Sequence, residues 1–389
     1  MTIGIDKIGF YTPNQYVDLV ELALKRRIDP AKFTIGIGQD KMAVAPLSQD
    51  VVSMGANAAA KILTPEDKAA IDLVILGTES GVDNSKAGAL IIHRLLKLPN
   101  TARVLEIKEA CYGATAGLQY AKLHLLQNPK AKALVIGSDI ARYGLETSGE
   151  VTQGAGAVAL LLSAEPHILA LDLPSSYYSE DIDDFWRPLD QLTAEVDGKY
   201  STTAYIEFFE KVFKDYQAKT GLTLEDYAAI TYHLPYTKMG LKALKQVLPM
   251  ASDEKQTELQ QHYQQETLYS RQVGNIYTGS LYLALLSLLN NDRVLKPGMR
   301  IGLYSYGSGA VAEFFSGKLQ PNYTKYLDPI YYLELFEKRQ KLTIADYEAQ
   351  FKAQLEPIAP GQVLENQDPS AQFYFAGVVD KKRQYKEIK

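Results

Sequence analysis

The sequence contains very little cysteine and histidine: Cys111 is the only cysteine among 389 residues, and there are five histidines. A single cysteine excludes intramolecular disulfides, and it excludes zinc or iron–sulfur sites that need several cysteines. No two histidines have the spacing of a metalloprotease motif. The sequence therefore predicts no metal site.

The chain also lacks an excess of basic residues and long apolar runs. Its formal net charge of −5 argues against a general nucleic-acid-binding protein. The longest apolar runs, such as Leu281–Leu289, are too short to cross a membrane. Residues 1–6 have neither the basic nor the apolar region of a signal peptide. We therefore expect a soluble, cytoplasmic protein without a nucleic-acid or membrane partner.

Apolar runs that predict strands alternate along the chain with stretches that favour helices. Residues 71–79 and 133–139 are nearly continuous apolar runs, as in parallel strands that are buried on both faces. Helices are expected over 51–62 and 86–96. This alternation predicts an α/β fold, and the length allows two domains or one large duplicated domain.

One six-residue pattern occurs twice in the chain. Residues 154–159 read Gly-Ala-Gly-Ala-Val-Ala, and residues 307–312 read Gly-Ser-Gly-Ala-Val-Ala. We interpret each copy as a glycine-rich turn followed by a strand, and the pair as an internal duplication. The predicted halves are residues 1–165 and residues 166–389.

Other segments depart from this rhythm. Residues 172–202 are rich in Asp, Tyr and Ser and contain the only tryptophan, so we expect an inserted lid or pocket wall. Residues 318–389 are expected to form a peripheral extension of two or three helices, a strand near 372–379 and a solvated basic tail. Near the N-terminus, a helix is predicted over 16–27 and an extended, glycine-spaced segment over 32–42.

The only cysteine lies between a predicted strand, 101–107, and a predicted helix, 118–126. Small residues surround Cys111 and allow backbone or ligand to approach closely. A cysteine near a helix N-terminus is favoured as a thiolate. The alternative interpretation is a buried cysteine that packs as a small hydrophobic residue.

Two other reactive side chains also follow predicted strands. Glu79 ends the strand 71–79, and His233 ends a short strand beginning at Ile230. Each alone is more often a surface or structural residue, but strand ends converge in a duplicated α/β domain. With Cys111 they supply a nucleophile, a carboxylate and an imidazole, the set needed for covalent thiol chemistry with proton transfer. The backbone N–H groups at Cys111 and in Gly307-Ser308-Gly309 are candidates for an oxyanion hole.

Other residues and other classes of protein account for the sequence less well. Asp139 and Asp184 are interpreted as structural or pocket-lining residues. A Cys–His protease would not explain Glu79 or the duplication. A non-catalytic binding protein, for example one that binds acyl-CoA, would not require a cysteine at the start of a helix.

Several motifs resemble, in order, those of a known enzyme family. The nucleophile motif is Glu109-Ala110-Cys111-Tyr112-Gly113-Ala114-Thr115-Ala116. The other motifs are Gly77-Thr78-Glu79, Asp197-Gly198-Lys199-Tyr200-Ser201, His233-Leu234-Pro235-Tyr236-Thr237-Lys238, Gly274-Asn275-Ile276-Tyr277-Thr278-Gly279-Ser280 and Tyr304-Ser305-Tyr306-Gly307-Ser308-Gly309. Over residues 5–317 the chain resembles the bacterial type of 3-hydroxy-3-methylglutaryl-CoA (HMG-CoA) synthase, a family of the thiolase superfamily.

The resemblance implies a duplicated, thiolase-like αβαβα layered fold with an inserted lid region and a C-terminal extension. It also implies the condensation of acetyl-CoA with acetoacetyl-CoA and water to give (S)-HMG-CoA and CoA, in the mevalonate pathway to isoprenoids. Cys111 would carry the acetyl group, Glu79 would move protons to and from carbon and oxygen, and His233 would bind acetoacetyl-CoA and assist as an acid. A ketoacyl synthase of the same superfamily is the alternative, but such enzymes carry Cys-His-His or Cys-His-Asn sets.

The resemblance further implies a set of substrate-binding residues. Asn275 would orient the acetoacetyl group, and Ser308 would complete the oxyanion hole with Cys111. The residues expected to line the CoA and acyl pocket or to meet CoA are Asp29, Thr152, Ser201, Lys238 and Lys242. No cofactor is expected beyond the CoA thioester substrates, and a homodimer is implied.

Overall fold

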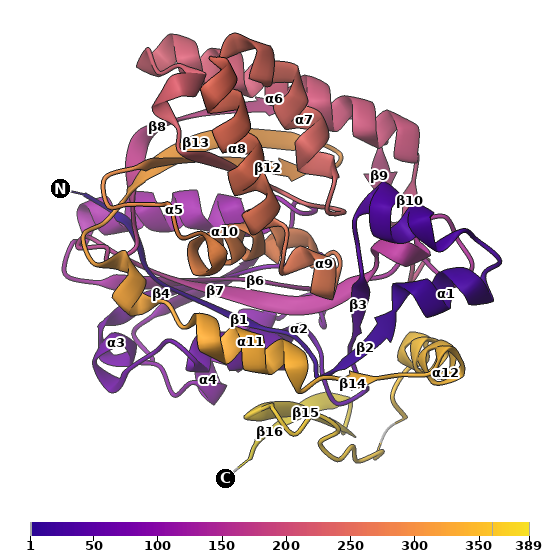
Figure 1. Ribbon diagram of the computed structural model, residues 1–389. Helices are drawn as coiled ribbons and strands as arrows, with labels where there is room; N and C mark the ends of the chain where they lie inside the picture. The colour runs from indigo at the N-terminus through magenta and orange to yellow at the C-terminus, as the bar shows by residue number, and fades with distance from the viewer. Residues whose placement is uncertain (1, 360, 389) are drawn as a thin grey trace.

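The computed structural model describes residues 2–359 and 361–388, and its centre is a nine-stranded sheet (Figure 1). The strands follow one another across the sheet in the order β11 (Ala229–Tyr232), β12 (Arg300–Gly307), β13 (Val311–Leu319), β8 (Leu169–Ser179), β1 (Gly4–Tyr11), β7 (Gly154–Ser163), β6 (Lys132–Ala141), β4 (Ile71–Gly77) and β5 (Arg103–Ile107). The helices are α1 (Leu19–Lys25), α2 (Val51–Ala60), α3 (Pro65–Ala70), α4 (Gly88–Leu95), α5 (Gly113–Gln127), α6 (Gly198–Thr220), α7 (Met239–Val247), α8 (Asp253–Glu266), α9 (Ser270–Val273), α10 (Ser280–Asn291), α11 (Pro329–Glu337) and α12 (Ile344–Leu355). The short outlying strands are β2 (Gln15–Asp18), β3 (Lys41–Val44), β9 (Phe185–Trp186), β10 (Glu195–Val196), β14 (Gln340–Lys341), β15 (Phe373–Val379) and β16 (Lys382–Glu387).

The sheet consists of two similar halves that meet where β1 pairs with β8. In the first half, β1 is antiparallel to β7, β7 is antiparallel to β6, and β6 is parallel to β4. In the second half, β8, β13, β12 and β11 repeat the same sequence of pairings. This repeat confirms the predicted duplication. Strand β5 extends the first half and forms one edge of the sheet.

Helices lie between and outside the two half-sheets, which gives five layers (Figure 1). The central helices α5 and α10 share one apolar core with strands of both halves. Helices α2 and α4 cover the outer face of the first half, while α6 and α7 cover that of the second. The layered, thiolase-like α/β fold that the sequence predicted is therefore confirmed. Its division at residue 165 into separate domains stays a prediction.

Glycine lets the central helix approach the sheet where the functional loops begin. A Cβ atom on Gly77, at the end of β4, would lie 2.3 Å from the backbone nitrogen of Ala114 in α5. No side chain fits in that space. The backbone at the end of β4 is therefore in direct contact with the backbone at the start of α5.

The predicted insert over 172–202 is wrong at both ends. Residues 172–179 belong to the core strand β8, and residues 198–202 are the first turn of α6. Pro174 and a polar second half disguise the strand; beyond that proline, Tyr177 and Ser179 are exposed while Ser176 is buried. The irregular segment is residues 180–197, which form the small β9–β10 hairpin.

Two predictions near the N-terminus are also wrong. Residues 15–18 form strand β2 instead of the first turn of a helix, because they pair with β3 on one side and β14 on the other. Residues 32–37 form a π-helix, not an extended segment, and Gly38 ends it in the left-handed conformation with a φ of 85°.

The C-terminal extension packs more firmly on the rest of the protein than predicted, and it does not end in a solvated tail. Strand β16 replaces the predicted basic tail, and its Tyr385 is buried and donates to Asp50 at 2.6 Å. Asp368 is completely buried and accepts from Tyr11 and from the backbone of Asn14. Tertiary contacts of this kind cannot be read from local patterning.

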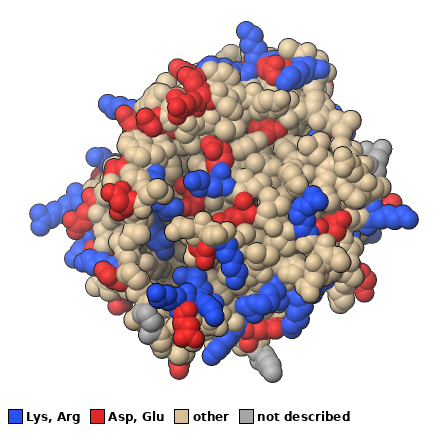
Figure 2. All heavy atoms as spheres, turned by 180° about the vertical axis from the view of Figure 1, so that it is seen from behind, with Lys and Arg blue, Asp and Glu red and all other residues tan. Residues whose placement is uncertain are grey.

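The surface carries charges of both signs. On the face opposite to the view of Figure 1, basic and acidic side chains are interspersed and form no large patch of one sign (Figure 2). None of the helices within residues 2–359 and 361–388 combines the length and apolar character needed to cross a membrane.

Candidate active site

Cys111 lies on a sharp turn between strand β5 and helix α5. Ala110, just before it, has a φ of +37°, a conformation that is strained for a residue with a side chain. Helix α5 begins at Gly113, two residues after the cysteine. The turn places the thiol at the end of the helix, in the wall of a cavity. A reactive cysteine is therefore favoured over a buried cysteine that only packs as a small hydrophobic residue.

Glu79 follows strand β4 and meets the cysteine. The Cys111 thiol donates to Glu79 Oε1, with Sγ and Oε1 3.4 Å apart. Burial, together with the charge of Asp139, raises the pKa of the Glu79 carboxyl above its ordinary value. Burial and the charge of Glu79 in turn raise the pKa of the Cys111 thiol. The thiolate that we expected from the helix terminus is therefore not the resting form, and the carboxylate is placed to take the thiol proton.

Asp139, completely buried in β6, fixes the loop that carries Glu79. Its Oδ1 atom accepts from the backbone nitrogens of Glu79 (2.9 Å) and Ser80 (3.1 Å) and from the hydroxyls of Thr78 and Ser80 (2.9 Å each). Its Oδ2 atom accepts from the backbone and hydroxyl of Thr278, just before α10. One carboxylate thus joins the loops of the two half-sheets beside Cys111.

Replacing Asp139 by asparagine should misplace Glu79. The amide would turn an NH₂ group toward one of two sets of donors, leaving buried N–H and O–H groups without an acceptor. We expect kcat to fall by about 10²-fold, within the range that a misplaced acid–base group costs.

A matched control is Asp368→Asn. Asp368 is also completely buried and accepts several hydrogen bonds, but it lies in the C-terminal extension. Both variants should have a lower Tm, and only Asp139→Asn should lose kcat. Equal kcat values for the two variants would contradict the role of Asp139.

His233 follows strand β11 and enters the same cavity as Cys111. Its backbone nitrogen donates to the carbonyl of Tyr304 at 2.8 Å, and its own carbonyl accepts from the Tyr205 hydroxyl. Burial lowers the pKa of the His233 imidazole to about 3. The ring is therefore neutral at physiological pH, and it serves as a hydrogen-bonding group instead of an imidazolium ion.

Asn275 forms the wall of the cavity beside His233. Its Oδ1 atom accepts from the backbone of Tyr277 and the hydroxyl of Ser280, which fixes the amide orientation. Its Nδ2 atom donates to the Tyr143 hydroxyl at 3.2 Å. The amide is thus held with its NH₂ end toward Tyr143 and the cavity.

The turn after β12 brings Ser308 to the cysteine. A Cβ atom on Gly307 would lie 2.6 Å from Cβ of Tyr112, so the two turns press against each other. The buried carboxylate of Asp184 accepts from the backbone of Gly309 at 2.8 Å and from the Tyr306 hydroxyl at 2.9 Å. Asp184 therefore anchors this turn as Asp139 anchors that of Glu79.

The cavity has a volume of about 710 Å³ and contains most of the predicted site. Predicted residues in its lining are Cys111, Thr152, Ser201, His233, Lys242, Asn275 and Ser308. Glu79 lines a neighbouring cavity of about 800 Å³, and Ser308 lines both. Glu79 thus stands in the partition between the two cavities, with its carboxylate in contact with the thiol.

Two predicted substrate-binding residues lie elsewhere. The exposed Asp29 accepts from the backbone of Ala31 at 3.0 Å and begins the turn into the π-helix. Lys238 precedes α7, and its backbone donates to Ile37. Neither residue is among those that line the cavity, which include Gly36 and Ile37.

The structure also adds residues that sequence reasoning missed. The cavity lining includes Tyr143, Phe185 and Tyr306. The rings of Tyr143 and Phe185 meet edge to face, with centroids 6.0 Å apart. The position of Tyr143 after β6 was the only available signal, because aromatic residues are frequent throughout this chain. Within the described part of the chain, no three His, Cys, Asp or Glu side chains are grouped as metal ligands.

Comparisons with known proteins agree with this geometry. The model of the hydroxymethylglutaryl-coenzyme A synthase N terminal region matches residues 1–166, and that of the C terminal region matches residues 169–265 and 252–359. A hydroxymethylglutaryl-CoA synthase of Enterococcus faecalis is 53% identical over 356 residues, which are 92% of this chain and 93% of the relative.

Solved structures give the same result. A crystal structure of an HMG-CoA synthase complexed with CoA matches with a TM-score of 0.96 at 42% identity, and all of both chains is covered. The enzyme MvaS in complex with 3-hydroxy-3-methylglutaryl coenzyme A matches with a TM-score of 0.90 at 37% identity, over 100% of this chain and 99% of that one. These matches, over a site in which Cys111 and His233 line one cavity and Glu79 contacts the cysteine, show that this chain belongs to the hydroxymethylglutaryl-CoA synthase family.

Proposed function

We propose that the protein condenses acetyl-CoA with acetoacetyl-CoA and water, giving (S)-HMG-CoA and CoA. The observation that carries this proposal is the hydrogen bond from the Cys111 thiol to Glu79, at the edge of a cavity that also holds His233 and Asn275. A nucleophile in contact with a carboxylate of raised pKa suits both thioester exchange and proton abstraction from carbon.

In the first step, the acetyl group moves from CoA to Cys111. Glu79 accepts the thiol proton as sulfur attacks the acetyl carbonyl, and the departing CoA sulfur takes up that proton. The backbone N–H groups of Cys111 and Ser308 would stabilise the oxyanion, each contributing about 2.7–4 kcal/mol. This step leaves Cys111 acetylated and Glu79 ionised again.

In the second step, Glu79 removes a proton from the acetyl methyl group. The resulting enolate attacks the ketone carbon of acetoacetyl-CoA, and Glu79 returns the proton to the new alkoxide. The raised pKa of Glu79 makes it a stronger base than an exposed glutamate. Water then hydrolyses the thioester at Cys111, which releases HMG-CoA and restores the thiol.

His233 and Asn275 would hold the acetoacetyl group. The pKa of His233, lowered to about 3, keeps the ring neutral, so its N–H donates to the ketone or thioester oxygen. Asn275 presents an oriented NH₂ group. Because both groups stay neutral, they polarise the ketone without taking the proton that Glu79 must return.

Thr152, Ser201 and Lys242 in the cavity lining would contact the acyl and pantetheine groups. The exposed Lys242 is the candidate for a CoA phosphate, since its ammonium group already bonds to the Tyr236 hydroxyl at 2.7 Å at the cavity mouth. Asp29 and Lys238 are not among these lining residues, and their contact with CoA stays a prediction.

We further propose that the reaction needs no cofactor or metal. A thiol, a carboxylate and neutral donors supply every proton and electron pair in the steps above. Turnover should therefore be unchanged after dialysis against a chelator. Loss of activity that a divalent metal restores would contradict this part of the proposal.

A homodimer in the cytoplasm completes the proposal. Strand β5 is an edge strand, and helix α5 beside it exposes Tyr120, Leu123 and Leu126. An unpaired edge next to apolar side chains is suited to pairing with a second copy. Light scattering at micromolar concentration should give twice the chain mass.

The proposed location in the cytoplasm rests on the free catalytic thiol, which suits a reducing compartment.

One assay separates this function from that of a ketoacyl synthase. The purified protein should consume acetoacetyl-CoA when acetyl-CoA is added, and it should release one CoA thiol for each HMG-CoA formed. A ketoacyl synthase would instead release CO₂ from a malonyl thioester. CO₂ release without loss of acetoacetyl-CoA would overturn the proposal.

A further inference from the structure

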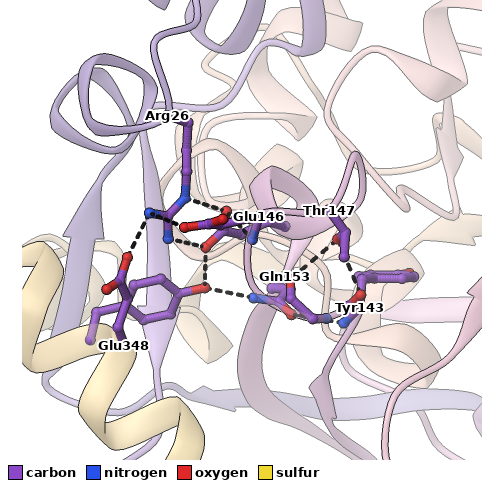
Figure 3. Close-up of polar contacts among 9 residues, drawn as sticks. Arg26, Tyr143, Glu146, Thr147, Gln153 and Glu348 are labelled. Atoms are coloured by element: carbon purple, nitrogen blue, oxygen red, sulfur yellow. Dashed lines mark hydrogen bonds and ion pairs between the residues drawn. The ribbon is translucent and has the colours of Figure 1, made fainter.

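Helix α12, in the C-terminal extension, contacts the loop that forms one wall of the cavity. We call residues 142–153 the wall loop; it supplies Tyr143, Ser148, Gly149 and Thr152 to the cavity lining. Although α12 begins almost 200 positions later in the chain, it lies beside α1 and next to this loop (Figures 1 and 3).

The contact is a continuous chain of hydrogen bonds. The buried Tyr347 hydroxyl of α12 accepts from Gln153 Nε2 at 2.8 Å, and it donates to Glu150 at 3.2 Å. Gln153 Oε1 accepts from the backbone nitrogens of Tyr143 (2.7 Å) and Gly144 (3.1 Å). Figure 3 shows the Gln153 side chain turned toward the backbone at Tyr143. Tyr347 is thus two hydrogen bonds away from a residue in the cavity wall.

A buried ion pair fixes the same loop from its other side. Arg26 binds Glu150 through two N–H groups, each 2.8 Å from a carboxylate oxygen, and it also binds Glu348 of α12 (Figure 3). The exposed fractions of the Arg26 and Glu150 side chains are 8% and 3%. Bidentate pairs of this kind fix geometry as well as supplying energy. The helix is therefore attached to the wall loop directly through Tyr347 and indirectly through Arg26, and both attachments include Glu150.

Tyr143 connects the wall loop to the candidate active site. The Tyr143 hydroxyl accepts from Asn275, and its ring packs against Phe185 and Tyr277. Without α12, Gln153 Nε2 would lose its hydrogen bond to Tyr347. The position of the wall loop beside these aromatic rings would then no longer be fixed by α12.

We propose that Tyr347 is a positioning residue for this enzyme, and that α12 sets the placement of Tyr143 and hence of Asn275. Tyr347 is not one of the lining residues, and its hydroxyl acts through its hydrogen bonds to Gln153 and Glu150. The kinetic part of the test rests on the proposed function, whereas the fluorescence part does not.

The test compares Tyr347→Phe with Tyr385→Phe. Tyr385 is a matched control, since it is a buried tyrosine of the same extension whose hydroxyl donates to a carboxylate, Asp50, far from the wall loop. Each variant loses a hydroxyl that makes two hydrogen bonds, and each should have a lower Tm. Only Tyr347→Phe should lower kcat/KM for acetoacetyl-CoA, by about tenfold, which corresponds to ~1.4 kcal/mol.

The only tryptophan offers a second readout. Trp186 follows Phe185, whose ring contacts that of Tyr143, so its fluorescence reports on this wall without any substrate. Acrylamide quenching of Trp186 should change in Tyr347→Phe and stay unchanged in Tyr385→Phe. If Tyr347→Phe does not fold, Glu348→Gln, which weakens the Arg26 attachment of the same helix, takes its place.

The proposal stands only if both kcat/KM and quenching change in the α12 variant and neither changes in Tyr385→Phe. Any other combination in an active preparation overturns it, including equal kinetic losses in both variants, which would indicate general destabilisation. If the wild-type protein is inactive in the condensation assay, the proposed function fails, and quenching alone decides the positioning role.

Discussion

Cys111→Ser should take up no acetyl group from labelled acetyl-CoA and should lose on the order of 10⁴-fold or more in kcat, as when a covalent nucleophile is removed. Serine is slightly smaller and can still donate to Glu79, but a hydroxyl is a much weaker nucleophile than a thiol in the same place. Mass spectrometry of the quenched protein and a turnover assay measure the two effects.

The folded structure should survive this substitution. Cys111 is only half-buried and contributes little packing, so Tm should shift by no more than a few degrees. A folded Cys111→Ser protein that retains label or normal turnover would show that another residue is the nucleophile.

Glu79→Gln should separate the two chemical steps. The amide cannot accept a proton, so condensation should fall by about 10²–10⁴-fold, the usual contribution of a general acid–base group. Acetylation of Cys111 should be slower, since Glu79 also accepts the thiol proton, but it should go to completion. Rapid-quench measurement of acetyl-enzyme and of HMG-CoA checks both rates. A Glu79→Gln protein with normal turnover would remove the carboxylate from the mechanism.

The same substitution should raise stability at neutral and alkaline pH. Burial raises the folded-state pKa of Glu79, so the folded protein binds this proton more tightly than the unfolded chain. The favourable contribution of this group is therefore complete at low pH and is lost as the pH rises through the folded-state pKa. Thermal unfolding of Glu79→Gln at pH 8 should give a higher Tm than wild type, and the difference should shrink toward pH 5.

Much of the active site could be predicted because strand ends carry its chemistry. Glu79, Cys111 and His233 each follow a strand that the sequence marks clearly, and the repeated pattern at 154–159 and 307–312 indicated that the halves would converge. In the structure the second pattern is the turn from β12 into β13, as predicted, whereas residues 154–159 lie entirely within the equivalent strand β7, so the turn predicted there is wrong.

What the sequence did not reveal depends on long-range contacts. Strand β8 is polar along much of its length and is a strand only because β13 and β1 pair with it. Burial and the neighbouring charge of Glu79 raise the pKa of the Cys111 thiol, and no local pattern indicates either of them. The same holds for Asp139, whose partners Thr78 and Thr278 lie on either side of it in the chain, 61 and 139 positions away.

The most direct test of the account is a pulse–chase measurement on the wild-type protein. The protein is acetylated with labelled acetyl-CoA, freed of excess substrate, and then mixed rapidly with acetoacetyl-CoA. We predict that label leaves the Cys111 peptide and appears in HMG-CoA at a rate at least equal to kcat. Label that stays on Cys111 over many turnover times, without labelled HMG-CoA being formed, would contradict the acetyl-cysteine pathway.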